Sequence, residues 1–101
     1  MPQIQREAKI VNKYGLHARP AMKFVELANQ FGSRIEVSNG ALTVDAKSIM
    51  SVMRLAAVQG TTLKIAADGS DAKAAVAALA KLVESGFDEM TGETTFPSIE
   101  P

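Results

Sequence analysis

The only histidine of the chain, His17, lies in the heptapeptide Gly15-Leu16-His17-Ala18-Arg19-Pro20-Ala21. Gly15 permits a sharp turn, and Pro20 suits the first turn of a helix, where its missing N–H costs nothing. A helix N-terminus carries roughly +0.5 of an elementary charge and several unpaired N–H groups, so it attracts anions. The heptapeptide therefore predicts a nucleophilic imidazole at an anion-binding helix start, with Arg19 beside it.

The composition excludes several other kinds of chemistry. The 101 residues contain no cysteine, which rules out disulfides, thiolate metal sites and thiol catalysis. One histidine without cysteine offers no familiar metal-ligand cluster, so we expect neither a metal nor another cofactor. There is no apolar run at the N-terminus and no stretch of roughly 18 apolar residues. We therefore expect a cytoplasmic protein that does not insert into a membrane.

Charge is distributed unevenly along the chain. Residues 1–86 hold all eleven basic residues and seven acidic ones, a formal charge of +4. Residues 87–101 hold four acidic residues and no basic one, a formal charge of −4. The mildly basic body suits an acidic partner or phosphate. Its field is too weak to indicate nucleic acid, and the strands lack the aromatic motifs of RNA-binding sheets.

Hydrophobic periodicity predicts the elements that position the heptapeptide. We predict strands at 3–12, 34–38, 42–44 and 61–67, and helices at 18–31, 46–58 and 72–85. In the first helix, the spacing i, i+3, i+4, i+7 defines a buried face made of Ala21, Phe24, Val25 and Ala28.

Turn and cap residues predict where these elements end. Gly32 should end the first helix in a left-handed conformation, and Asn39-Gly40 should form a tight hairpin turn. Asp45 or Ser48 should cap the second helix, and the turn 68–71 should cap the third.

The resulting order, βαββαβα, predicts an α+β fold, a two-layer open-faced sandwich. In it, three helices cover one face of a four-stranded antiparallel sheet. We expect a single domain over residues 1–88. Residues 89–101 have no hydrophobic period and contain two prolines. We expect them to form a mobile acidic tail.

Two motifs carry a resemblance to a known family. They are the heptapeptide at 15–21 and the segment Asp45-Ala46-Lys47-Ser48-Ile49-Met50, followed by Leu55 and Gln59-Gly60-Thr61. Over about residues 3–87, the chain resembles the HPr family, the histidine-containing phosphocarrier proteins of the bacterial phosphoenolpyruvate-dependent phosphotransferase system. The resemblance implies that His17 accepts a phosphoryl group from enzyme I and passes it to an enzyme IIA-type protein. Such a protein is a carrier and does not turn over a substrate by itself.

The chemistry of the heptapeptide agrees with this implication. Neutral imidazole is a nucleophile near pH 7 and needs no separate base. Phosphohistidine keeps a reactive P–N bond, so the group can be passed on. Arg19 offers planar donors to the phosphoryl oxygens, and the N–H groups of Ala18 and Arg19 are further donors. The alternative for Arg19 is an ordinary solvated side chain.

The resemblance also implies a regulatory site and a docking surface. Ser48 matches the serine that HPr kinase/phosphorylase modifies in regulated members, although it also fits a plain helix cap. The docking surface would consist of Ala18, Ala21, Lys23, Lys47, Ile49, Met50 and Met53. For Met50 and Met53, a place in the core is an equal alternative.

Other functional interpretations remain open at this stage. The segment 85–89 resembles the end of the nitrogen-type branch of the family, which serves regulation more than sugar uptake. A nitrogen-type regulatory carrier is therefore the alternative interpretation. A different possibility is an interaction module, similar to a corepressor, that acts when Ser48 is phosphorylated. We expect the chain to be a monomer.

Overall fold

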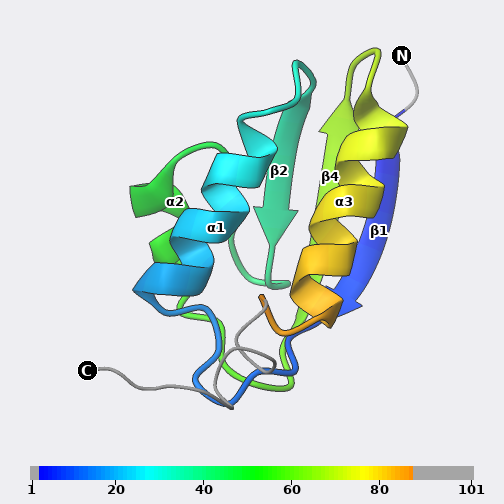
Figure 1. The fold of residues 1–101 in the computed structure, drawn as a ribbon. Coiled ribbons are helices and arrows are strands. Elements are labelled where there is room, and N and C mark those ends of the chain that lie inside the picture. The colour runs from blue at the N-terminus through cyan, green and yellow to red at the C-terminus, as the bar shows by residue number, and fades with distance from the viewer. Residues whose placement is uncertain (1–2, 88–101) are drawn as a thin grey trace.

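The structure, a computed structural model, describes residues 3–87 as a four-stranded antiparallel sheet with three helices packed on one face (Figure 1). The elements are β1 (Ile4–Lys9), α1 (Ala18–Ala28), β2 (Arg34–Ser38), β3 (Thr43–Asp45), α2 (Ile49–Met53), β4 (Thr62–Asp68) and α3 (Ala72–Glu84). The predicted βαββαβα sandwich is confirmed. The tail predicted at 89–101 lies outside the described residues.

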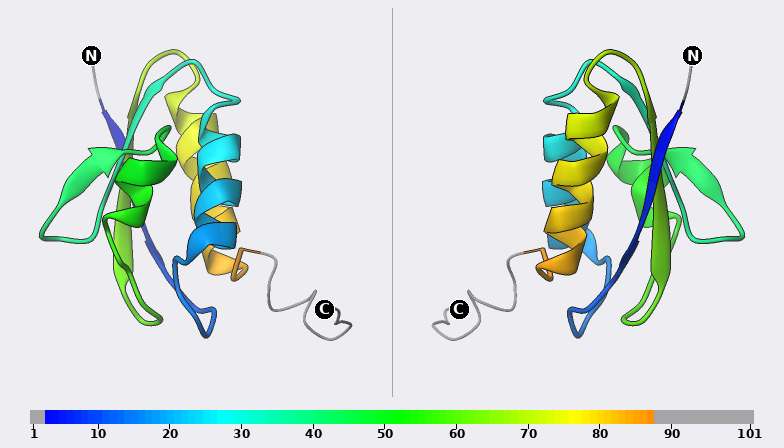
Figure 2. Two further views of the ribbon diagram at one scale, coloured as in Figure 1. Left: turned by 90° about the vertical axis from the view of Figure 1, so that its left-hand side faces the viewer. Right: turned by 90° about the vertical axis from the view of Figure 1, so that its right-hand side faces the viewer.

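The strands are arranged in the order β1-β4-β2-β3, so β1 and β3 form the two edges of the sheet. In β4, Leu63 and Ile65 face the helices, while Lys64 between them faces outward and is exposed. The same alternation buries Ile35 and Val37 of β2. Figure 2 shows the sheet edge-on, with α1 and α3 on one side and the other face uncovered. None of the helices within residues 3–87 is long and apolar enough to cross a membrane.

The core between sheet and helices fixes the rotation of α1. Its largest fully buried side chains include Phe24 of α1, Ile35, Leu63 and Ile65 of the sheet, and Leu79 of α3. Burying a side chain of this size stabilises the fold by about 1.5–3 kcal/mol. Because the Phe24 face of α1 is held against the sheet, the opposite face, with Ala18, Arg19 and Met22, is exposed.

The end of α1 differs from the prediction. The helix ends at Ala28, and Gly32 is not among the residues with positive φ. The last carbonyl groups are bound instead by the backbone N–H groups of Gln30 and Phe31, which donate to the Leu27 and Ala28 oxygens at 3.0 and 3.2 Å. The Asn29 amide also donates to the Val25 oxygen, at 2.9 Å. These bonds satisfy the last carbonyl groups of α1 without a glycine in the left-handed conformation.

The second helix is much shorter than predicted, because the chain leaves the helical path after Met53. Ala56 has a φ of +47°, and the Ala57 carbonyl accepts a bond from the Leu16 N–H at 2.9 Å. Ser48 occupies the N-cap position, and its hydroxyl accepts from the Ser51 N–H at 3.3 Å. The carboxylate of Asp45, the other candidate cap, accepts instead from the Lys47 N–H at 2.9 Å, before the helix begins.

The hairpin between β2 and β3 is confirmed, with a wider turn than two residues. The last strand pair is Ser38 with Thr43, which leaves four residues in the loop. The Asn39 carboxamide oxygen accepts from the N–H groups of Ala41 and Leu42, and Gly40 has a φ of +98°. The asparagine thus shapes the turn through its side chain.

Asp71 stands at the N-cap position of α3, but its side chain does not cap that helix. Its carboxylate accepts from the N–H groups of Gly32 at 2.9 Å and Ser33 at 3.0 Å, and from the Ser33 hydroxyl. The Ser33 hydroxyl, followed by the Gly32 N–H, holds the pKa of Asp71 below its usual value of 3.8. The prediction that this turn caps α3 through its side chain is therefore wrong, and the carboxylate instead links the start of α3 to the segment before β2.

This link should make stability depend on pH. A carboxyl group whose pKa is lower in the folded state stabilises the fold above its unfolded pKa and loses that contribution as pH falls through the folded pKa. We expect Asp71→Asn to lower the melting temperature at pH 7. The curves of variant and unaltered protein should converge below about pH 4. Thermal unfolding from pH 7 to pH 2 measures this, with Asp68→Asn as the neighbouring control. Parallel curves for Asp71→Asn would contradict the link.

Candidate functional site

His17 is the N-cap residue of α1, with extended backbone angles of φ −83° and ψ −170°. The first bond within the helix runs from the Ala21 N–H to the His17 carbonyl oxygen, at 3.0 Å. The N–H groups of Ala18 and Arg19 therefore have no acceptor within the helix, and Pro20 has no N–H to leave unpaired. The structure confirms that the heptapeptide starts a helix with His17 beside its positive end.

The loop before His17 has a fixed shape. Gly15 has a φ of +66°, and its carbonyl oxygen accepts from the Asn12 amide at 2.7 Å. The Leu16 N–H donates to the Ala57 carbonyl oxygen at 2.9 Å, and the Leu16 side chain is buried in the core. The residue before His17 is thus held by both its backbone and its side chain, which limits movement of the histidine.

A second loop, at 56–61, supports the first. The N–H of Ile10 donates to the Thr61 oxygen at 2.9 Å, and the N–H of Gly60 donates to the Ile10 oxygen at 2.8 Å. The Gln59 side chain donates to the Val11 oxygen at 3.0 Å. The residues Gln59-Gly60-Thr61, which belong to the second sequence motif, therefore hold the loop that carries His17.

The His17 side chain is partly exposed and has an aromatic neighbour. The Tyr14 ring lies edge-on to it, with 6.2 Å between the ring centroids and 88° between the planes. Lys13 Nζ lies 5.4 Å from the centre of the Tyr14 ring, a cation–π distance. Arg19 is exposed two residues beyond the histidine. The sequence prediction missed Tyr14, although its place in the loop before the histidine was a usable signal.

Exposed apolar side chains gather on α1, α2 and the 56–61 loop. Met22, Ile49, Met50, Met53 and Val58 expose 36–76% of their surface, and we call them the apolar patch. The exposure of Met50 and Met53 argues against the core alternative. Met22 and Val58 were missed. Met22 could have been found, because it falls outside the buried face of α1 defined by the helical spacing.

Three predicted partner-binding residues are placed differently. Ala21 is completely buried, so its side chain cannot touch a partner, and that prediction is wrong. Ala21 shares the buried face of α1 with Phe24. Lys23 and Lys47 are half-buried: Lys23 Nζ donates to the Phe87 oxygen at 3.2 Å, and Lys47 Nζ donates to the Phe31 oxygen. Both lysines bind neighbouring segments of the fold.

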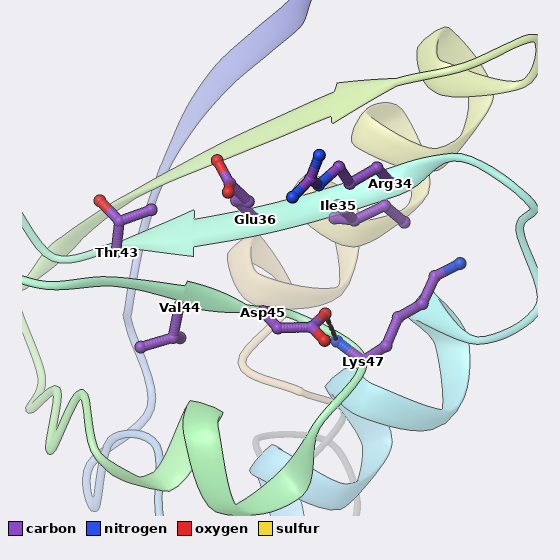
Figure 3. Close-up of a pocket in the computed structure, with 7 residues that line it drawn as sticks. All are labelled: Arg34, Ile35, Glu36, Thr43, Val44, Asp45 and Lys47. Carbon is purple, nitrogen blue, oxygen red and sulfur yellow. Dashed lines mark hydrogen bonds between the residues drawn. The ribbon is translucent and has the colours of Figure 1, made fainter.

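A shallow hollow of about 290 Å³ lies beside β2 and β3, and no residue of the heptapeptide lines it (Figure 3). Within it, the Asp45 carboxylate accepts from the backbone N–H of Lys47 at 2.9 Å, while the lysine side chain extends away. A group that receives phosphate from another protein needs an accessible surface more than a pocket. His17 has such a surface, and the hollow belongs to a different part of the molecule.

An open-faced sandwich that presents a partly exposed histidine at a helix start is the arrangement of a histidine-type phosphoryl carrier. The family described as "PTS HPr component phosphorylation site" matches residues 4–85. The chain belongs to this family, the HPr phosphocarrier proteins of the phosphotransferase system.

Known proteins resemble the chain over nearly their whole length. Phosphocarrier protein HPr of Cupriavidus necator is 45% identical over 86 residues, which cover 85% of this chain and 97% of that protein. Phosphocarrier protein NPr of Proteus mirabilis is 42% identical over 90 residues, 88% of this chain and 99% of that protein. The crystal structure of HPr-C-His from Thermoanaerobacter tengcongensis is 45% identical, with a TM-score of 0.78, over 88% of this chain and 98% of that one.

Proposed function

We propose that the chain accepts a phosphoryl group from enzyme I on His17 and delivers it to an enzyme IIA-type protein. The observation that carries this proposal is the position of the partly exposed imidazole at the N-cap of α1. In the proposed step, an imidazole nitrogen attacks the phosphorus, a P–N bond forms, and the bond from phosphorus to the donor breaks. Transfer onward is the same exchange with the acceptor's nucleophile.

The helix start supports this step electrostatically. Phosphoryl transfer needs little covalent chemistry beyond positioning and charge stabilisation. The N–H groups of Ala18 and Arg19 and the Arg19 guanidinium are donors for the phosphoryl oxygens. The bonds from Leu16 and Gln59 to neighbouring loops hold the histidine in place before the donor arrives.

Incubation with enzyme I, phosphoenolpyruvate and Mg²⁺ tests the proposal. The chain should gain the mass of one phosphoryl group at neutral pH and lose it in acid, because the P–N bond of phosphohistidine is acid-labile. Intact mass spectrometry at both pH values gives the result. A chain that gains no mass, or gains an acid-stable phosphate, would overturn the proposal.

Removal of the Arg19 side chain should slow transfer without unfolding the protein. Arg19 is exposed, so Arg19→Ala should leave the melting temperature nearly unchanged. Losing a charged donor to the transferring group should lower kcat/KM for phosphorylation by enzyme I about 10- to 100-fold. Arg34→Ala, which removes an exposed arginine on the uncovered face of the sheet, is the matched control. Equal rates for the two variants would remove the assigned role of Arg19.

The apolar patch next to His17 supports docking of several partners. Methionine side chains are flexible and polarizable, so one surface can fit different proteins. Ile49, Met50 and Met53 belong to this patch, and Ala18 is exposed at its side. Lys23 and Lys47 would contribute positive charge from positions at which they also hold the fold together.

The position of Ser48 supports a role as a regulatory phosphorylation site that weakens this docking. It is the N-cap of α2, immediately before the exposed Ile49 and Met50. A phosphoryl group there would add about −1.5 to −2 charges at the edge of the apolar patch. The structure gives Ser48 a capping role as well, and the two roles are compatible.

The Ser48→Asp variant should separate these roles. Asp is as good an N-cap as Ser, so the fold should keep its stability. The added charge should raise the Kd for enzyme I by about 10-fold, which corresponds to 1.4 kcal/mol. Calorimetric titration measures the Kd, with Ser70→Asp, on the exposed turn before α3, as control. Binding of Ser48→Asp as tight as that of the control would rule out this regulatory role.

The carrier could serve either sugar uptake or nitrogen-type regulation. The similarity to an NPr protein is as extensive as the similarity to HPr proteins, which keeps the nitrogen-type regulatory carrier as the alternative. Genes for sugar permeases next to this one would favour sugar uptake, and a nitrogen-type enzyme IIA would favour regulation. The corepressor-like module predicts function without His17. The monomeric state and the cytoplasmic location stay predictions.

A further inference from the structure

We propose that the C-terminal segment, residues 88–101, folds back onto the surface around His17 and competes with partner proteins for it. The competition rests on the function proposed above. The contact itself does not depend on that function: the place where the described chain ends, the charges of segment and surface, and the apolar patch all favour it.

The body of the protein ends next to α1. Phe87 is buried, its N–H donates to the Leu82 oxygen at 2.9 Å, and its carbonyl oxygen accepts from Lys23 Nζ at 3.2 Å. Lys23 is six residues after His17, about 9 Å along the helix axis. Figures 1 and 2 show the last turn of α3 and the first turn of α1 at the same end of the molecule. The segment therefore starts beside the proposed phosphoryl-transfer site.

The length of the segment is sufficient. Fourteen residues follow Phe87. An extended chain of that length spans at most about 50 Å, and a flexible one has a root-mean-square span of about 20 Å. Either value exceeds the distance from Lys23 to His17 along α1, so every part of the surface around the histidine is within reach.

The charges of segment and surface are complementary. The surface formed by residues 12–28 and 48–60 holds four basic residues and one acidic residue; these are Lys13, Arg19, Lys23, Arg54 and Glu26. The segment holds four acidic residues and no basic one; they are Asp88, Glu89, Glu93 and Glu100. Opposite charges on exposed side chains attract over about 8–10 Å at moderate ionic strength, and salt weakens this attraction.

Apolar side chains give the contact a second component. The segment contains Met90, Phe96 and Ile99 between its acidic residues. The apolar patch exposes 52% of Met22 and 76% of Met50, which is unusually high for large apolar side chains. An acidic chain with interspersed apolar residues matches a basic surface with an apolar centre, the same surface proposed to receive partner proteins.

The expected strength is modest, as a reversible competitor requires. A short tether gives an effective concentration on the order of 1 mM. With an intrinsic Kd between about 0.2 and 1 mM, the segment would occupy the surface for about half to five-sixths of the time. Because enzyme I can bind only while the surface is vacant, the segment should slow phosphorylation roughly two- to sixfold relative to a chain whose segment does not bind.

The test uses two full-length triple variants of equal net charge. E89Q/E93Q/E100Q removes three charges from the segment, and E7Q/E36Q/D68N removes three from the uncovered face of the sheet. Amide chemical shifts of Arg19, Met22 and Met50, measured by NMR without any partner, report contact directly. The kcat/KM for phosphorylation by enzyme I, at about 20 mM and 300 mM salt, reports competition.

We expect the segment variant alone to shift these amides and to be phosphorylated two- to sixfold faster at low salt, with the difference disappearing at high salt. Unchanged amide shifts would overturn the contact, whatever the rates are. Shifted amides with unchanged rates would overturn the competition. If the unaltered chain takes up no phosphate at all, the proposed function fails, and the NMR comparison still decides whether the segment binds this surface.

Discussion

The His17→Ala variant is expected to take up no phosphate from enzyme I and phosphoenolpyruvate, while the unaltered chain gains one phosphoryl group. No other histidine exists in the sequence, so no second imidazole can replace the acceptor. The rate should fall below detection, at least about 1,000-fold, as is usual when a covalent nucleophile is removed. Intact mass after a fixed incubation measures the loss.

The fold should survive this substitution, which makes the result interpretable. The His17 side chain is partly exposed and makes no capping bond to α1, so alanine at the N-cap should cost less than about 1 kcal/mol. Ser48→Ala is the informative control, because it removes the other proposed phosphorylation site and should still gain one acid-labile phosphate. Phosphate on the His17→Ala chain would show that the acceptor is a different residue.

Local sequence signals predicted the backbone geometry around His17, because the features that determine it are local. Gly15, His17 and Pro20 have conformational preferences that act within one turn of the chain, and the structure starts α1 where they indicate. The same holds for the strands, whose alternation depends on neighbouring residues. Ala21 is instructive: the helical spacing correctly placed it on the buried face, and the family resemblance wrongly placed it on the docking surface.

The features that were missed depend on contacts between distant segments. Ala56 adopts a positive φ, and the Ala57 carbonyl bonds with Leu16, forty-one positions earlier in the chain, so α2 stops short of the predicted end. Asp71 binds Gly32 and Ser33, which are 38 to 39 positions away. Hydrophobic periodicity carries no information about such pairs, because it describes which face is buried and not which backbone groups will meet.

Lys23 and Lys47 show that the sequence pattern also does not reveal which distant carbonyl groups a charged side chain will bind. Both were predicted to meet partners because of the resemblance to the HPr family. In the structure, each ammonium group donates to a carbonyl oxygen at the end of a helix or turn, Phe87 for Lys23 and Phe31 for Lys47. An ammonium group that donates to one carbonyl oxygen keeps its charge and two further N–H groups, so either lysine can still contribute positive charge to the surface.

The Gly15→Ala variant should be strongly destabilised, by about 2–5 kcal/mol, because two costs combine at this position. Gly15 has a φ of +66°, which disfavours any side chain. A Cβ atom there would also lie 2.5 Å from the Ala57 oxygen and 2.8 Å from the Val58 Cα, both backbone atoms that cannot rotate away. Urea unfolding at 25 °C measures the loss in free energy.

Gly40→Ala separates the two costs. Gly40 also has a positive φ, +98°, but no atom beyond its own chain neighbours lies within 4 Å of the position of its Cβ, so this variant should lose only about 1 kcal/mol. The folded fraction of Gly15→Ala should in addition accept phosphate more slowly than Gly40→Ala, because the clash displaces the bond between Leu16 and Ala57 that positions His17. Equal stability of the two variants would mean that the 56–61 loop yields to the new methyl group, and that the histidine is held less firmly than these contacts indicate.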